Sequence, residues 1–191
     1  MTGPALEQAL GAVAALRIAV FRDWPYLYAG DLAYEKGYLE AYREPGAVLV
    51  GAFDGDRLVG AATGTPLAAH AGEFAEAFEG TGIAVGDVFY CAESVLLRDY
   101  RGQGVGHRFF DLREAAAREA GFAKSAFCSV IRPEHHPARP ADFAPLDPFW
   151  RARGYAPLPG AVAEFAWTDI GQAEETVKPM QIWLRDLGPG L

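Results

Sequence analysis

The 191-residue sequence predicts a mixed α/β fold, in which helices flank a central sheet that contains parallel strands. Three observations predict it. An apolar face that recurs every three or four residues opens the chain and indicates a helix. An Asp-Gly turn joins two apolar runs into a hairpin. A later strand pattern leads through glycines directly into another helix. Since 51% of the residues are hydrophobic, the chain can bury one full core, and we expect a single domain over residues 1–191.

The first third of the chain is expected to form two helices and the hairpin. The first helix covers about residues 5–22, and it ends before Pro25 because proline disfavours helical geometry in the residue that precedes it. Its apolar face consists of Leu6, Leu10, Val13, Leu16 and Val20. A shorter helix follows over 32–42. The hairpin pairs residues 47–53 with 57–65.

The rest of the chain alternates between strand and helix patterns. We expect a short helix over 68–78, a strand over 88–97, a helix over 105–120 and a strand over 122–131. Residues 132–148 hold five prolines and predict a long irregular loop of the kind that is often functional. A short helix over 148–153 and a strand pair, 161–168 with 179–184, complete the predicted order.

Composition and charge exclude some function classes. The net charge of −8 argues against nucleic acid as a partner, because binding to the phosphate backbone needs clustered Lys and Arg. An acidic chain suits a cationic substrate, although acidity also serves solubility alone. The sequence lacks a long apolar run and a basic leader, so we expect no membrane span and a cytoplasmic protein. Cys91 and Cys128 lie inside apolar runs and are expected to be buried free thiols.

The stretch Arg101-Gly102-Gln103-Gly104-Val105-Gly106, here named the glycine turn, lies between a strand pattern and a helix pattern. The N–H groups at a helix N-terminus have no partners within the helix, and glycine lets a ligand approach them, so the stretch predicts a phosphate site. A dinucleotide fingerprint would need glycine where the chain has His107, and the Gly-Lys-Ser/Thr of a triphosphate loop is absent.

The glycine turn resembles the acetyl-coenzyme A signature of the GNAT acetyltransferase superfamily, written Q/R-x-x-G-x-G/A, with Arg101, Gly104 and Gly106 in its fixed positions. The order of predicted elements is similar to that family over most of the chain. Residues 149–155 also resemble its second motif, an aromatic residue and a polar stretch that end in glycine and an aromatic residue. The resemblance implies the GNAT fold, with a mixed sheet whose two central parallel strands splay apart.

The resemblance also implies a site for acetyl-coenzyme A between strands 88–97 and 122–131. Backbone groups of Ser94, Val95 and Leu96 would pair with the pantetheine arm as an added strand does. The pyrophosphate would be held by the glycine turn and the next residue, that is, by Arg101, Gly102, Gln103, Gly104, Val105, Gly106 and His107. The main-chain N–H of Leu96 would be the oxyanion donor.

Glu93 is the candidate catalytic base, because amine acetylation needs a group that takes the amine proton. It lies in the middle of an apolar strand pattern, where burial would raise its pKa and make it a better proton acceptor. A strand glutamate that points outward or pairs with an arginine is the alternative.

The proton donor for the departing thiolate stays open. Trp150 stands where relatives often have tyrosine, and an indole cannot give up a proton in this role. Tyr155, Tyr90 or water could replace it. The adjacent His135 and His136 are expected to serve as a substrate contact or an alternative base, and no metal site is expected, since no further ligand lies at metal spacing.

The acceptor site is expected in the loop between the first two helices. There Trp24, Tyr26 and Tyr28 are interleaved with Asp23, Asp31 and Glu35, a composition that can hold an alkylammonium through cation–π contact and charge. The alternative is that the aromatic residues only pack the first helix onto the sheet.

The sequence therefore predicts an N-acetyltransferase that moves an acetyl group from acetyl-coenzyme A to a primary amine of a small molecule or peptide, directly in a ternary complex. A catalytically silent acyl-coenzyme A binding module and a transferase of a longer acyl group are the alternatives. A homodimer is left open.

Overall fold

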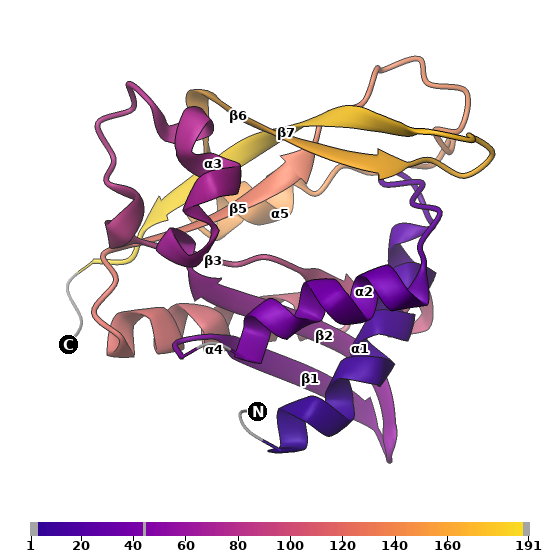
Figure 1. The fold of residues 1–191 in the computed structure, drawn as a ribbon, viewed down its shortest axis with the longest axis horizontal. Helices are drawn as coiled ribbons and strands as arrows, with labels where there is room; N and C mark the ends of the chain where they lie inside the picture. Colours follow the sequence, from indigo (N-terminus) through magenta and orange to yellow (C-terminus); the bar gives the residue numbers. More distant parts are fainter. Residues whose placement is uncertain (1–3, 44, 189–191) are drawn as a thin grey trace.

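The described part of the chain, residues 4–43 and 45–188 of this computed structural model, forms a mixed sheet with helices on both faces (Figure 1). The helices are α1 (Pro4–Phe21), α2 (Leu32–Leu39), α3 (Ala71–Phe78), α4 (Val105–Glu119) and α5 (Asp147–Ala152). The strands are β1 (Val48–Asp54), β2 (Arg57–Pro66), β3 (Val88–Tyr90), β4 (Ser94–Leu96), β5 (Lys124–Val130), β6 (Ala156–Thr168) and β7 (Glu175–Asp186). The predicted mixed α/β class is confirmed.

The sheet contains one parallel pair, and that pair separates part-way along its length. The strand order is β1-β2-β3-β5-β7-β6, with β4 paired to β2. β3 and β5 run parallel from Val88 beside Lys124 to Tyr90 beside Ala126, and the Cys91 N–H still bonds to Ala126 O at 2.7 Å. Beyond this point the two strands no longer pair with each other, because β4 pairs with β2 and β5 pairs with β7. We name the resulting space between β4 and β5 the strand split.

A β-bulge at Ala92 and Glu93 interrupts the strand predicted over 88–97, so that prediction is wrong in its middle. The N–H of Ala92 donates to Thr63 O, and the N–H of Thr63 donates to Glu93 O, each at 3.1 Å. Ala92 and Glu93 therefore lie opposite the single residue Thr63. Such a bulge bends the strand and changes the direction of the side chains at the bend. Apolar periodicity alone does not reveal such an extra residue.

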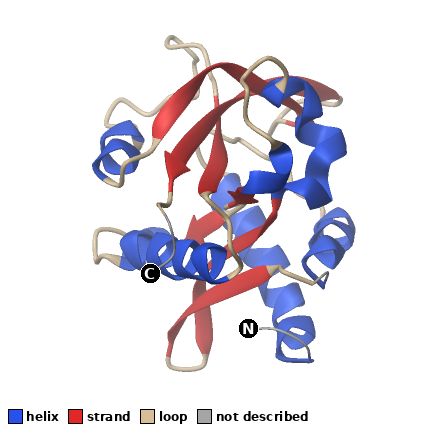
Figure 2. Ribbon diagram, turned by 90° about the vertical axis from the view of Figure 1, so that its left-hand side faces the viewer, coloured by secondary structure: helices blue, strands red, loops and turns tan. Residues whose placement is uncertain are grey.

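The helices cover the two faces of the sheet differently. α1 and α2 pack on β1, β2 and β4, with Leu10, Val13 and Leu39 buried between them. α3 covers the same face nearer β6, and α4 and α5 cover the opposite face, over an aromatic cluster that includes Phe110 and Phe127. Figure 2 shows the strands between these two groups of helices. Of the predicted apolar face of the first helix, Leu10, Val13 and Leu16 are buried in the core, whereas the side chain of Leu6 lies outside the described part of the chain.

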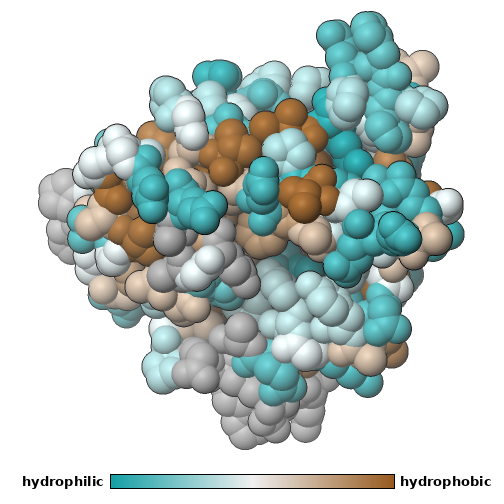
Figure 3. Space-filling model, turned by 45° about the horizontal axis from the view of Figure 1, so that its top comes forward, coloured by the Kyte–Doolittle hydropathy of each residue, from teal (hydrophilic) through white to brown (hydrophobic). Residues whose placement is uncertain are grey.

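The C-terminal hairpin, β6 with β7, is longer than predicted. β6 begins at Ala156 and β7 at Glu175, ahead of the expected starts at 161 and 179, and the ladder has a register break between Pro157 and Val162. From the side of this hairpin, hydrophobic groups lie among hydrophilic ones on the surface (Figure 3), and Val162 and Val177 are exposed. Both cysteines are free thiols, of which Cys91 is buried and Cys128 half-buried. No helix in the described ranges is long and apolar enough to cross a bilayer.

Candidate active site

The glycine turn presents unpaired backbone N–H groups beside open space. Gly102 and Gly104 have φ of 75° and 84°, and Gly104 is the N-cap of α4. The first helical bond runs from Arg108 N to Gly104 O at 3.2 Å, so the N–H groups of the preceding helical residues have no helical acceptor. A Cβ built on Gly102 or Gly104 would meet no atom within 4 Å. The turn thus fits an anion such as a coenzyme A pyrophosphate.

The outer edge of β4 faces the strand split. Its hydrogen bonds to β2 use Glu93 O and Leu97 N, the latter donating to Val59 O at 3.0 Å. The backbone N–H and C=O groups of successive residues point to opposite sides of a strand. Those of Ser94 and Leu96 therefore point into the strand split. Val95 lies opposite Ala61 and directs its groups to β2, so the expectation that it offers backbone contacts to a ligand is wrong.

Two arginines hold this edge. Arg101 is exposed, and its Nε donates to Leu96 O at 3.1 Å. Arg113, a fully buried residue of α4, donates from Nη1 to Thr63 O at 3.0 Å and to Glu93 O at 2.8 Å, and from Nη2 to Ser94 Oγ at 2.7 Å. The helix that begins at the glycine turn therefore also fixes the backbone of the β-bulge.

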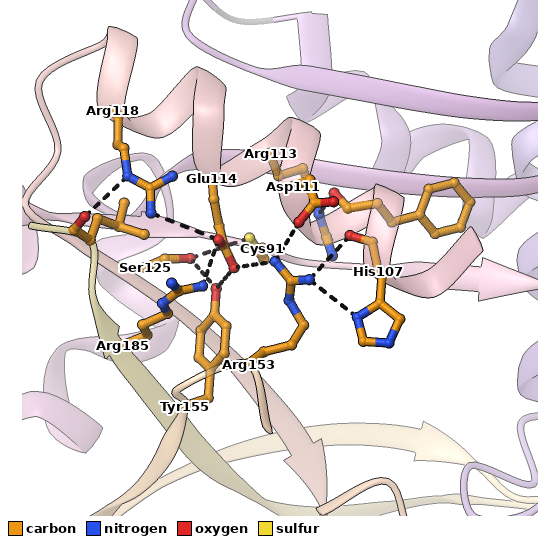
Figure 4. A network of polar contacts seen from close by, with 12 residues as sticks. Cys91, His107, Asp111, Arg113, Glu114, Arg118, Ser125, Arg153, Tyr155 and Arg185 are labelled. Atoms are coloured by element: carbon orange, nitrogen blue, oxygen red, sulfur yellow. Dashed lines mark hydrogen bonds and ion pairs between the residues drawn. The ribbon is translucent and has the colours of Figure 1, made fainter. Parts of the chain in front are cut away.

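A second buried network joins α4 to the strands behind it (Figure 4). Glu114 accepts hydrogen bonds from Tyr155 Oη at 3.1 Å, from Arg153 at 3.2 Å and from Arg185 at 2.7 Å. Arg153 also donates to Asp111 at 2.8 Å. These bonds tie α4 to β7 and to the end of α5, and Tyr155 Oη also forms a hydrogen bond with Ser125 of β5 at 2.9 Å. The helix that follows the glycine turn is therefore anchored at several points.

On the opposite face, a cavity of about 140 Å³ reaches the β-bulge, and it is the candidate acceptor site. Aromatic residues form most of its wall, among them Phe21, Tyr26, Tyr28, Tyr38, Tyr90 and Trp167. Its charged residues are Arg17, Glu35 and Glu93. The predicted acceptor segment therefore supplies Tyr26, Tyr28 and Glu35 to the wall.

The other residues predicted for the acceptor site lie elsewhere. Trp24 packs against His136 and Phe143, with ring centroids at 5.1 and 6.0 Å. Asp31 caps α2 by accepting from the Tyr34 N–H at 2.8 Å, and Asp23 lies 3.7 Å from Arg98. These three residues support the loop rather than line the cavity.

Glu93 is buried in the cavity wall and surrounded by donors. Tyr38 Oη donates to its Oε1 at 2.6 Å, Tyr42 Oη does so at 3.3 Å, and Thr63 Oγ1 donates to Oε2. Arg17 forms an ion pair with Oε1 at 2.5 Å. The alternative of pairing with an arginine is thus the arrangement found.

These partners reverse the expected pKa shift of Glu93. Burial acts to raise the pKa, but the charge of Arg17 and the hydrogen bonds from Thr63, Tyr38 and Tyr42 lower it below its ordinary value. The expectation of a raised pKa is wrong because burial was considered without these partners. Glu93 is therefore ionised at neutral pH.

The sequence reasoning missed Arg17, which pairs with both cavity carboxylates. Its Nε donates to Glu35 Oε2, and its guanidinium lies 4.4 Å from the ring centre of Tyr38. A signal was present, because Arg17 follows Val13 by four residues on the apolar face of α1. An arginine on a core face needs a buried partner.

The tyrosines proposed as proton donors are both constrained. Tyr155 is buried, and its hydroxyl bonds to Glu114 and Ser125 on the α4 face. Tyr90 lines the cavity and contacts Cys128 Sγ at 3.0 Å. Burial raises the pKa of both tyrosines, which weakens them as acids toward a thiolate. Trp150 packs against Phe127 and Trp183.

Arg132, at the start of the proline-rich loop, ties the segment after α1 to the end of β6. Its guanidinium forms a bidentate pair with Asp169 at 2.7 and 2.9 Å and donates to the carbonyls of Pro25 and Tyr26. Backbone bonds from Ala29 N to Thr168 O and from Ile170 N to Leu27 O join the same segments. Within the described ranges, no group of three or more His, Cys, Asp or Glu residues has metal-site geometry.

Comparisons with known proteins agree with this arrangement. The model of the "Acetyltransferase (GNAT) family" matches residues 14–141. The chain belongs to the GNAT acetyltransferase family. A search of the curated proteins found no match.

Solved GNAT structures share its fold. The ribosomal-protein-alanine N-acetyltransferase from Brucella melitensis is 16% identical, with a TM-score of 0.62 over 94% of this chain and 95% of that chain. An aminoglycoside 6'-N-acetyltransferase complexed with coenzyme A is 17% identical, with a TM-score of 0.58 over 98% of this chain and 93% of the other. That from Enterococcus faecium is 15% identical, with a TM-score of 0.59 over 98% and 93%.

The predicted GNAT fold, with its parallel strands splayed at their centre, is confirmed, and the protein is an acetyltransferase.

Proposed function

We propose that this GNAT protein transfers an acetyl group from acetyl-coenzyme A to a primary amine of a small molecule or peptide, directly within a ternary complex. One observation supports this most. Ala92 and Glu93 line the acceptor cavity, and the next residues form the open edge of β4. Donor and acceptor can therefore meet at the β-bulge.

On the donor side, backbone groups would hold acetyl-coenzyme A, which supplies the acetyl group as a thioester. The N–H groups of Val105, Gly106 and His107 lie at the positive end of the α4 dipole and suit the pyrophosphate. Gly102, Gln103 and Gly104 would leave room for its approach, and Arg101 adds positive charge. Ser94 and Leu96 would pair with the pantetheine arm, and the Leu96 N–H would also stabilise the oxyanion.

On the acceptor side, Glu93 would accept the proton of the amine. Because its pKa is lowered, the carboxylate is ionised and ready to accept a proton, but it is a weak base. An acceptor that binds as an ammonium would first lose one proton to solvent, because only the neutral amine attacks the thioester. Glu93 would take the second proton late in the reaction, when the attacking nitrogen has become more acidic. The constrained Tyr90 and Tyr155 favour water as the proton source for the leaving thiolate.

A thiol-release assay with acetyl-coenzyme A and a panel of amines, amino acids and peptide N-termini tests the proposed reaction. We expect one acetylated amine for each thiol released. Initial rates at varied concentrations of both substrates should give intersecting lines. Parallel lines, together with an acetylated Cys128, would instead indicate an acyl-enzyme, since Cys128 is the cysteine in the cavity wall. Coenzyme A binding without turnover of any amine would overturn the proposal.

A further inference from the structure

The size, wall and charge of the acceptor cavity define a narrower class of acceptor than a primary amine in general. We infer that the acceptor is a compact monoamine with an aromatic or branched-alkyl body, and that Glu35 binds its ammonium group. This inference rests on the proposed function, because it takes the cavity as the acceptor site.

The volume of the cavity suits an acceptor body of about one ring. The cavity measures about 140 Å³. An engineered apolar cavity of about 150 Å³ in another protein holds benzene, whereas pockets for drug-sized ligands are roughly 300–1,000 Å³. A single aromatic ring or a branched alkyl group of similar size fits this space. An aminoglycoside or a polypeptide segment would leave most of its body outside this space.

The wall favours an apolar body. Phe21, Tyr26, Phe165, Trp167 and Met180 contribute rings and a thioether. The rings of Tyr26 and Trp167 lie 6.0 Å apart, and those of Phe21 and Tyr26 lie 4.5 Å apart. The Trp167 Nε1 and the Lys178 ammonium nearby are already bonded to backbone carbonyls, Tyr26 O and Trp167 O. Their hydrogen bonds are therefore used within the protein.

The charge of the wall suits one cation. Two carboxylates, Glu35 and Glu93, face one guanidinium, Arg17, so these three groups carry a net charge of −1. One ammonium group neutralises that charge, whereas a polycation would place further uncompensated charges among aromatic rings. The acidity of the whole chain does not define this local balance.

Glu35 supplies the unused acceptor atom. Its side chain is fully buried, Oε2 accepts from Arg17, and Oε1 has no hydrogen-bond partner among the described residues. A buried carboxylate oxygen without a donor is unfavourable, and an ammonium group would relieve this cost. The Tyr28 hydroxyl lies beside this carboxylate, and burial, the Glu35 charge and hydrogen bonding to Glu35 all raise its pKa, so an ammonium group would share Glu35 with Tyr28. The carboxylate of Glu93, by contrast, already accepts hydrogen bonds from three hydroxyl groups and pairs with one guanidinium.

Thiol release with four probes tests the acceptor class. The probes are benzylamine, isoamylamine, kanamycin and the peptide Ala-Ala-Ala-Ala. We expect kcat/KM for the first two to exceed that for the others by about 100-fold or more, since the larger probes cannot bury their bodies. A preference for kanamycin or the peptide would overturn this inference while leaving the proposed function intact. Failure of every amine would overturn the proposed function.

Calorimetric titration tests the role of Glu35 without turnover. Glu35→Gln should weaken benzylamine binding about tenfold or more, because a charge-assisted hydrogen bond is lost, and change benzyl alcohol binding by less than about twofold. An equal effect on both ligands, or none on benzylamine, would overturn the assignment.

A second variant keeps the test independent of the Arg17 pair. Ala166→Leu adds bulk at an exposed position in the cavity wall, and Ala156→Leu does so on the same strand outside that wall. Only the first variant should lose benzylamine binding. Retained binding in Ala166→Leu would overturn the proposed placement of the ligand.

Discussion

The donor side of the site consists mainly of main-chain groups, whereas the acceptor side consists of side chains. On the donor side, main-chain groups of the glycine turn and of β4 face open space, and one contiguous stretch of sequence supplies most of them. On the acceptor side, side chains from α1, α2, the β-bulge, β5, β6 and β7 enclose a small cavity around three charged groups. A backbone site depends on φ angles and helix ends, whereas a side-chain site depends on tertiary packing.

Because different elements hold the two sides, a substitution can weaken coenzyme A binding without weakening amine binding, or the reverse. Arg113 and Glu114 brace the donor side through α4, and Arg132 with Asp169 braces the acceptor side through the β6–β7 hairpin. A substitution on one side should therefore leave binding to the other nearly unchanged.

The largest effect is expected for Glu93→Gln. Loss of the proton acceptor should lower kcat by about 10²–10⁴-fold in the thiol-release assay. Calorimetry should show unchanged coenzyme A affinity, because the Glu93 carbonyl, not its side chain, contacts Arg113. Glu164→Gln, at an exposed position of β6, is the control and should keep full activity. Activity within about twofold of the original chain in both variants would remove Glu93 from the catalytic role.

A nearly as large effect is expected for Gly104→Val on coenzyme A binding. The side chain would enter the open space beside the turn and would strain a backbone with φ of 84°. Gly171→Val is the matched control, because Gly171 has φ of 83° and also meets no atom within 4 Å, but lies in the β6–β7 loop.

Both glycine variants should lose about 1–2 kcal/mol of unfolding free energy from backbone strain. Only Gly104→Val should weaken coenzyme A, by about 100-fold, because its side chain displaces the ligand. Gly106→Ala should bind normally, since its Cβ would meet Phe149 at an ordinary 3.5 Å. Equal coenzyme A affinity in the two valine variants would contradict the phosphate site.

An intermediate effect is expected for Asp169→Asn. It leaves the buried Arg132 guanidinium without its charged partner, which should cost roughly 3 kcal/mol of unfolding free energy in a denaturant titration. Because the pair fixes the segment that carries Tyr26 and Tyr28, KM for the amine should rise several-fold. The coenzyme A affinity should not change. A change confined to coenzyme A would show that the two sides are coupled.

The smallest effect is expected in the pH dependence of stability. Arg17 and the surrounding hydrogen bonds lower the pKa of Glu93 in the folded protein despite its burial. A group with a lowered folded pKa stabilises the fold above its unfolded pKa, about 4.3 for Glu, and loses this contribution as the pH falls below it.

The unfolding free energy of the original chain should therefore decrease as the pH is lowered from 7 to 3. The decrease should be smaller in Glu93→Gln. A slope that is the same in both proteins would contradict the lowered pKa.

The sequence predicted what local rules determine. The hairpin over residues 48–66 and the turn into α4 depend on Asp-Gly and glycine chemistry, so they are visible in the chain itself. The β-bulge was not visible, because it depends on Thr63, which lies about thirty residues earlier and bonds to both Ala92 and Glu93. The pKa direction of Glu93 failed for the same reason, since Arg17 and Tyr38 are distant in sequence.

The acceptor side was predicted only in part. Tyr26, Tyr28 and Glu35 could be proposed because aromatic and acidic residues alternate in one loop. Trp24 has the same character but packs against His136, and composition cannot distinguish the two environments. Trp167 and Met180 lie inside the predicted strands 161–168 and 179–184, but which residues of a strand line a cavity depends on how the hairpin packs against the rest of the chain.

The unpaired edge of β4 also bears on self-association. An open strand edge with free backbone groups is a template for intermolecular pairing and aggregation. Here β4 is only three residues long, and Arg101 donates a hydrogen bond to the carbonyl of Leu96, the last carbonyl of the strand that points away from β2. The arginine that opens the glycine turn thereby protects the edge from another chain, while a flexible guanidinium can still move aside for a ligand.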